Sequence, residues 1–149
     1  NTVLALRWTD GPLRVLGENS LCFVNADGTL AGTYSYSGRY LKGFALDREG
    51  SCALLLGKYR AGSSAELVTV GNDGLGLESL PLNDQVLSLS SAGRYVSLLT
   101  ADGLTIFSGS LAEPYHVLEE LQGARKVFQR PDGSVFLIAG ETARLYLPD

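Results

Sequence analysis

His116 is the only histidine among the 149 residues, so it is the first place to look for nucleophilic or acid–base chemistry. A Ser-His-Asp arrangement needs a carboxylate that holds the imidazole in a pocket. His116 instead lies between Tyr115 and Val117 on a predicted outer strand, where it is expected at the rim of the fold. One histidine and two distant cysteines, Cys22 and Cys52, supply no zinc ligand set. The sequence therefore predicts no catalytic residue, no metal site and no cofactor.

Carboxylates beside glycine occur at 25–28 and 72–74, a pattern that superficially resembles a calcium loop. Both segments lack the further carboxylates and the distal glutamate of such a loop, so tight turns are the better interpretation. Glu113, Glu119 and Glu120 are the candidates for a glycosidase-like acid–base pair. Adjacent residues on a strand point to opposite faces, which makes a solvated rim the better interpretation of these three.

One connection, residues 57–65 with the sequence GKYRAGSSA, joins contact-prone side chains to small flexible residues. Loops carry much of the binding function of proteins, and tyrosine and arginine are favoured in protein contacts. Lys58, Tyr59 and Arg60 are therefore the predicted partner-contact residues. A mobile exposed loop without a partner is the alternative.

The elements that must position these residues are strands, because Asp-Gly pairs recur between apolar runs. The pairs end at Gly11, Gly28, Gly74, Gly103 and Gly133. Asp-Gly between β-rich runs is a strong hairpin signal, since glycine adopts a positive φ without a Cβ clash. The chain is thus predicted to be a series of hairpins, with no long helix.

These hairpins belong to a repeat. The segment VLSLSSAGRYVSLLT, which begins at Val86, aligns with segments that begin at Val3, Phe44 and Val127. The equivalent turn glycines are Gly11, Gly50, Gly93 and Gly133. Their spacing of about 40 residues is typical of propeller blades with four strands each. The strand after each glycine is apolar nearly throughout, so we expect it to be buried on both faces.

The repeat predicts an all-β fold, a propeller-like array of about four blades. The chain is treated as one partial domain, 1–149, with blades at 1–37, 38–83, 84–122 and 123–149. The expected strands are 3–8, 13–16, 21–25 and 29–36; 41–46, 52–56, 66–70 and 77–82; 86–90, 95–100, 104–108 and 115–119; and 126–129, 135–139 and 143–147. The last blade thus lacks its fourth strand. Tyr34, Tyr36, Tyr40 and Tyr95 are expected to pack between blades.

Charge and hydropathy exclude two classes of partner. The net charge is −4, and the largest cationic clusters are Arg125-Lys126 and 58–60, so no basic stripe for nucleic acid is present. No apolar run approaches the roughly 18 residues that a membrane span requires, so this segment does not insert into a membrane.

On these repeats the sequence resembles WD40-like and YVTN-like β-propellers. The stretch from VLSLSSAGRYVSLLTADGLTIF to RPDGSVFLIAGETARLYLP is similar to the end of a family of bacterial membrane-anchored propeller proteins. The resemblance implies the C-terminal half of a seven- or eight-bladed propeller. It also implies an extracytoplasmic location, with a membrane tether through a segment absent here. The chain contains no methionine, and we expect it to be part of a longer product.

A row of four blades leaves two apolar faces uncovered. Three closures are open: missing N-terminal blades of the same protein, a second copy that completes the ring around a two-fold axis, or closure of the four blades on themselves. Cys22 and Cys52 lie in blades one and two, so they do not tie the first blade to the last, which weakens the third closure. Two small buried hydrophobes are the favoured interpretation of these cysteines, and a disulfide is the alternative.

The function predicted from these features is a non-catalytic interaction or scaffold module that binds a protein or a surface polysaccharide. The alternative is part of a propeller hydrolase or lyase whose active site needs blades absent from this chain. Fold alone does not choose between the two functions.

Overall fold

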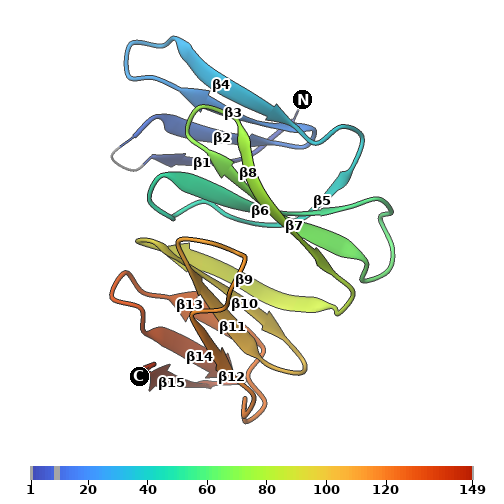
Figure 1. The fold of residues 1–149 in the computed structure, drawn as a ribbon, viewed down its shortest axis with the longest axis vertical. Helices are drawn as coiled ribbons and strands as arrows, with labels where there is room; N and C mark the ends of the chain where they lie inside the picture. Colours follow the sequence, from blue (N-terminus) through green and yellow to red (C-terminus); the bar gives the residue numbers. More distant parts are fainter. Residues whose placement is uncertain (1, 9–10, 149) are drawn as a thin grey trace.

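The computed structural model describes residues 2–8 and 11–148, and every named element within them is a β-strand (Figure 1). The first sheet contains β1 (Val3–Trp8), β2 (Leu13–Gly17), β3 (Ser20–Val24) and β4 (Leu30–Ser35). The second contains β5 (Tyr40–Ala45), β6 (Ser51–Gly57), β7 (Ala65–Gly71) and β8 (Gly76–Leu82). The third contains β9 (Val86–Ala92), β10 (Tyr95–Thr100), β11 (Leu104–Ser108) and β12 (His116–Leu118). The fourth contains β13 (Lys126–Gln129), β14 (Val135–Ala139) and β15 (Thr142–Tyr146).

Each sheet is an antiparallel meander in which strands adjacent in sequence pair with each other. The four sheets follow one another from the N-terminus to the C-terminus along the long axis of the molecule (Figure 1). The predicted array is confirmed: the described residues form an all-β fold, with three four-stranded sheets and a last sheet of three strands. No described segment forms a helix that could cross a membrane.

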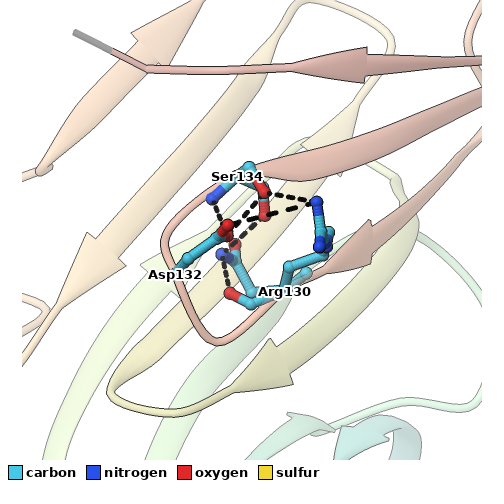
Figure 2. A network of polar contacts seen from close by, with 4 residues as sticks. Arg130, Asp132 and Ser134 are labelled. Carbon is cyan, nitrogen blue, oxygen red and sulfur yellow. Dashed lines mark hydrogen bonds and ion pairs between the residues drawn. The ribbon is translucent and has the colours of Figure 1, made fainter.

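The Asp-Gly turns at Gly28, Gly74 and Gly133 have the positive φ that the sequence predicts, whereas Gly103 does not have a positive φ, so the prediction is wrong there. Gly28 and Gly133 have φ of +88° and +94°, a region that side chains other than glycine rarely adopt. Figure 2 shows the turn between β13 and β14, in which an Asp132 carboxylate oxygen accepts hydrogen bonds from the backbone N–H and the hydroxyl of Ser134. These bonds hold the pKa of Asp132 below its usual value. Asp27 and Asp73 accept the equivalent bonds from Thr29 and Leu75, so these three aspartates help to close their hairpins.

Burial follows the position of each sheet in the stack. Every residue of β6 is buried, and so are the first five residues of β10. The expectation that all four equivalent strands are covered on both faces is wrong for β2 and β14, where buried and more exposed residues alternate. The reason is that the first and fourth sheets each have a neighbour on only one side.

The uncovered faces of the two end sheets are apolar. On the first sheet, Leu6, Trp8 and Leu30 are more than half exposed. On the fourth sheet, Phe128 is 60% exposed, and its cross-strand partner Phe136 and the next strand's Leu145 are also exposed. Exposed apolar residues thus cluster at both ends of the stack, where surfaces of this kind mark interaction sites.

Polar side chains also fasten the sheets to one another. Arg14 on β2 is fully buried and donates hydrogen bonds to the carbonyls of Leu46 and Arg48 and to Asn72 Oδ1 of the second sheet. Between the third and fourth sheets, the backbone N–H of Gln129 on β13 donates to Ser90 Oγ on β9 over 2.9 Å. The inner strands are therefore linked by side chains as well as by apolar packing.

The four tyrosines that were expected to pack between blades lie in three different places. Tyr34 and Tyr36 are neighbours, with ring centroids 6.5 Å apart, and Tyr36 is buried against the second sheet. The Tyr95 ring lies 5.6 Å from that of Tyr115 and packs against the buried residues of the fourth sheet, so interblade packing is confirmed for Tyr95. Tyr40 is 40% exposed and belongs to the cleft described next, so the expectation of interblade packing is wrong for this residue.

Candidate functional site

The loop between β6 and β7 carries the three predicted contact residues, and all three are exposed. The Lys58 ammonium lies 5.6 Å from the centre of the Tyr59 ring, and Tyr59 itself is 63% exposed. Arg60 turns toward β5, where its guanidinium carbon lies 4.9 Å from the centre of the Tyr40 ring. The loop therefore places cations against aromatic rings at one end of the sheets.

Arg60 lines a cavity of about 400 Å³ between the first and second sheets. We call this cavity the cleft. Its walls come from β1, the β2–β3 turn, the β4–β5 connection and the start of β5. The lining residues are Leu4, Glu18, Asn19, Gly38, Arg39, Tyr40, Leu41, Lys42 and Arg60. A volume of this size falls within the range of small-ligand sites.

The cationic side chains of the cleft differ in how far their hydrogen-bond donors are already used. Arg39 is structural: it donates to the Tyr36 carbonyl over 2.7 Å and forms an ion pair with Glu66. Lys42 donates to the Gly62 carbonyl over 2.7 Å and so ties β5 to the β6–β7 loop. Arg60 forms no ion pair with any carboxylate of the described residues. Its charge is therefore available to a ligand.

A second hollow, of about 360 Å³, adjoins the cleft. The two hollows share Leu41, Lys42 and Arg60, and the second extends to Gln85 and Val86 at the junction with the third sheet. Lys42 and Arg60 therefore stand between two depressions that together cross the end of the second sheet.

At the opposite end of the strands, turns of all four sheets line a depression of about 620 Å³. Asp47 and Glu49 contribute acidic groups there, and Asp47 forms an ion pair with Arg7 over 2.9 Å. Both partners of this pair are about half exposed, which limits its energetic weight. The linings of the two hollows therefore differ, with Arg39, Lys42 and Arg60 in the cleft and Asp47 and Glu49 in the opposite depression.

The remaining candidate residues do not join the cleft. His116 lies on the outer strand β12, and its Nε2 makes a hydrogen bond with the Tyr146 hydroxyl of the fourth sheet. Glu113, Glu119 and Glu120 are exposed. Within residues 2–8 and 11–148, no three His, Cys, Asp or Glu side chains are grouped so that they could bind a metal ion.

The two cysteines are free thiols. Cys52 is fully buried between the first and second sheets, and burial raises the pKa of its thiol to about 11. Cys22 is half-buried and faces away from the second sheet, since it pairs with Val15 and Thr33 rather than with the inward-facing Leu16. The disulfide alternative is not realised, and Cys52 serves as a small buried hydrophobe.

Sequence reasoning found Arg60 but missed Tyr40 and Lys42 as its neighbours. The signal was available in the pairing of β5 with β6, because Tyr40 lies opposite Gly57, the last residue before the loop. A loop that leaves β6 at this point must pass beside the first residues of β5.

Comparison with solved structures identifies the architecture. The structure of BamB from Moraxella catarrhalis superposes with a TM-score of 0.64 at 13% identity, over 90% of this chain and 41% of that one. The Neurospora crassa Pan2 WD40 domain gives 0.53 at 11% identity, over 96% and 60%. A KlHsv2 variant with loop 6CD replaced by a Gly-Ser linker gives 0.61 at 10% identity, over 89% and 48%.

These likenesses show the fold. The chain is a partial β-propeller, and its sheets are blades. It spans about two fifths to three fifths of the length of the propellers that it matches. No protein-family profile and no curated protein matches the sequence.

Proposed function

We propose that the protein is a non-catalytic β-propeller interaction module, which binds a protein or a surface polymer at the cleft and the adjoining β6–β7 loop. The observation that carries this proposal is Arg60, which is positioned over the Tyr40 ring in a cavity and has no described carboxylate partner. A positioned, unneutralised guanidinium beside exposed tyrosines has the composition of a protein contact site.

The blades beneath the cleft are fastened in a way that supports such a role. Arg39 joins the first blade to the second through Tyr34, Tyr36 and Glu66. A loop that is anchored to a rigid sheet stack loses little freedom when a ligand binds, which favours affinity.

The test is a selection of ligands from two libraries, random displayed peptides and soluble polysaccharides, on immobilised wild-type protein. The Tyr59→Ala, Arg60→Ala double variant is expected to lose the selected ligands. Lys126→Ala, an exposed cation on the fourth blade, is expected to retain them. Ligands that bind the double variant as well as the wild type, or two libraries that yield no ligand, would contradict the proposal.

We also propose that the open faces of blades one and four are covered in the working protein by further blades of the same protein, in a ring of seven or eight. The exposed Trp8 and Phe128 on these faces, and the partial span of the matched propellers, support this proposal. The resemblance to bacterial membrane-anchored propellers extends the proposal to an extracytoplasmic, tethered location. A second copy is the other occupant that the experiment below distinguishes.

Light scattering on this chain alone tests the coverage of the two faces. We expect the wild type to self-associate through its apolar end faces, and the Trp8→Asp, Phe128→Asp double variant to return to a single copy of 15.9 kDa. A discrete mass of two copies identifies a second copy as the cover, whereas heterogeneous association agrees with missing blades. A folded wild-type monomer would show that the faces need no cover.

A further inference from the structure

The chemistry of the cleft narrows the class of ligand, provided that the proposed interaction function is correct. The Arg60 guanidinium lies over the Tyr40 ring at 4.9 Å, a contact that restrains the long arginine side chain. A guanidinium packed on an aromatic ring still has N–H donors at its edge. These donors match the two oxygens of a carboxylate.

The charge around Arg60 also favours an anion. Lys42 lines both hollows next to it, and Lys58 lies two residues away on the same loop. The charge of Arg39 is neutralised by its ion pair with Glu66. The carboxylate that lines the cleft is Glu18. The cleft is therefore locally cationic on a protein whose net charge is −4. Such a local field attracts an anionic group against the overall charge.

The shape of the site favours an extended ligand. Hollows of about 400 Å³ and 360 Å³ lie on the two sides of Lys42 and Arg60. A chain that crosses the end of the second blade would place its middle over the two cations and its flanks in the hollows. Leu4, which is 52% exposed in the wall of the cleft, offers an apolar contact to one flank.

The aromatic rings argue for a peptide rather than a sugar. A sugar ring packs its C–H face on a free aromatic face. Here Tyr40 is contacted by Arg60 and Tyr59 by Lys58. Tyr40 is the ring that lines the cleft, and its contacted face presents the Arg60 N–H groups where a sugar site would present an open ring. We propose that the cleft binds an extended acidic peptide segment, with a glutamate or aspartate carboxylate paired to Arg60.

Fluorescence anisotropy tests the proposal with three labelled probes: a peptide of alternating Glu and Gly, its Gln counterpart, and an oligogalacturonate as an acidic sugar. The Glu peptide is expected to bind the wild type, and Arg60→Gln to weaken it by about 10-fold or more, the loss typical of a charge-assisted hydrogen bond. Arg60→Lys keeps the positive charge but lacks the paired N–H donors of the guanidinium. Its affinity for the Glu peptide should therefore fall between those of the wild type and Arg60→Gln. The Gln peptide should bind at least about 10-fold more weakly on the same grounds.

Lys126→Gln is the matched control, since it removes one exposed positive charge far from the cleft in the sequence and on another blade. It is expected to change the affinity by no more than about 2-fold, as for a remote screened charge. The variants alter exposed positions, so each is expected to keep the thermal midpoint of the wild type, which is measured to check that it is folded. An equal loss in Lys126→Gln and Arg60→Gln would overturn the assignment, because attraction would then be non-specific.

The remaining outcomes separate the ligand class from the proposed function. Failure of the Glu peptide to bind overturns the acidic-peptide inference. If the oligogalacturonate then binds and Arg60→Gln abolishes its binding, the cleft is still an interaction site and only the ligand class is wrong. The library selection described above tests the interaction function itself, whatever the result with these probes.

Discussion

Replacing Arg14 by methionine is expected to remove about 3 kcal/mol from the free energy of unfolding. The side chain is fully buried and donates to three acceptors of the second blade, the carbonyls of Leu46 and Arg48 and the Asn72 side chain. Methionine fills much of the same space but donates nothing, so all three acceptors lose a partner. A buried acceptor without a partner costs about 1–3 kcal/mol, so the two buried carbonyls and the half-buried Asn72 side chain together give a total of about 3 kcal/mol.

Urea unfolding measures this loss. At a slope of about 2 kcal/mol per molar urea, 3 kcal/mol lowers the midpoint by about 1.5 M. Arg7→Met is the control, because Arg7 is the cross-strand partner of Arg14 and carries the same charge. Its ion pair with Asp47 is about half exposed, so its removal should cost at most about 1 kcal/mol.

The cost of burying the Arg14 charge opposes the stabilisation by its hydrogen bonds. Arg14 brings a charge into the interior without a carboxylate partner, and its Nε has no hydrogen-bond partner among the described residues. Replacement of buried charges by apolar residues is stabilising in some proteins. If Arg14→Met is as stable as the wild type or more so, burial of the charge outweighs the three hydrogen bonds. The claim that Arg14 fastens blade one to blade two would then be wrong.

Two further predictions concern the same junction. A Cβ on Gly32 would lie 1.9 Å from the Asp73 carbonyl oxygen, so Gly32→Ala must push the two blades apart and should cost about 1–3 kcal/mol or more in urea unfolding, as overpacking does. Gly76→Ala, whose Cβ would meet the Tyr34 ring at 3.3 Å, should cost less, and an equal loss would contradict the packing described. In thiol titration of the native protein at pH 8, Cys22 should react and Cys52 should not, since burial raises the pKa of the Cys52 thiol to about 11. Denaturant should expose both thiols, and rapid reaction of two thiols in the native state would exclude the buried position of Cys52.

The blade array could be predicted from the sequence because its signals are local. Glycines with positive φ, such as Gly28 and Gly133, follow aspartate at hairpin turns, and the apolar runs between such turns recur with a constant spacing. Position in the stack is a global property. The sequences of β2 and β14 resemble that of β6, yet of these three strands β6 is the one with a described blade on both sides.

Arg14 shows why polar anchors between blades escape this kind of prediction. Arginine in a strand is ordinarily taken as exposed, and its three partners lie 32, 34 and 58 residues away. The cleft could be predicted only in part. Loop composition indicated Arg60, whereas the place of Tyr40 beside it depends on the register of β5 against β6.

The coverage of blade one and the shape of the cleft are physically connected. Leu4 of β1 forms part of the cleft wall, and the β1–β2 register shifts between Val3 and Ala5 beside it. The other face of β1 carries Leu6 and Trp8, which are exposed. Any blade that covers Trp8 therefore packs against the same strand that shapes the cleft. Ligand affinity should accordingly be compared between this chain alone and the chain with its end faces covered, because a rigid β1 would present the cleft with less conformational freedom to lose.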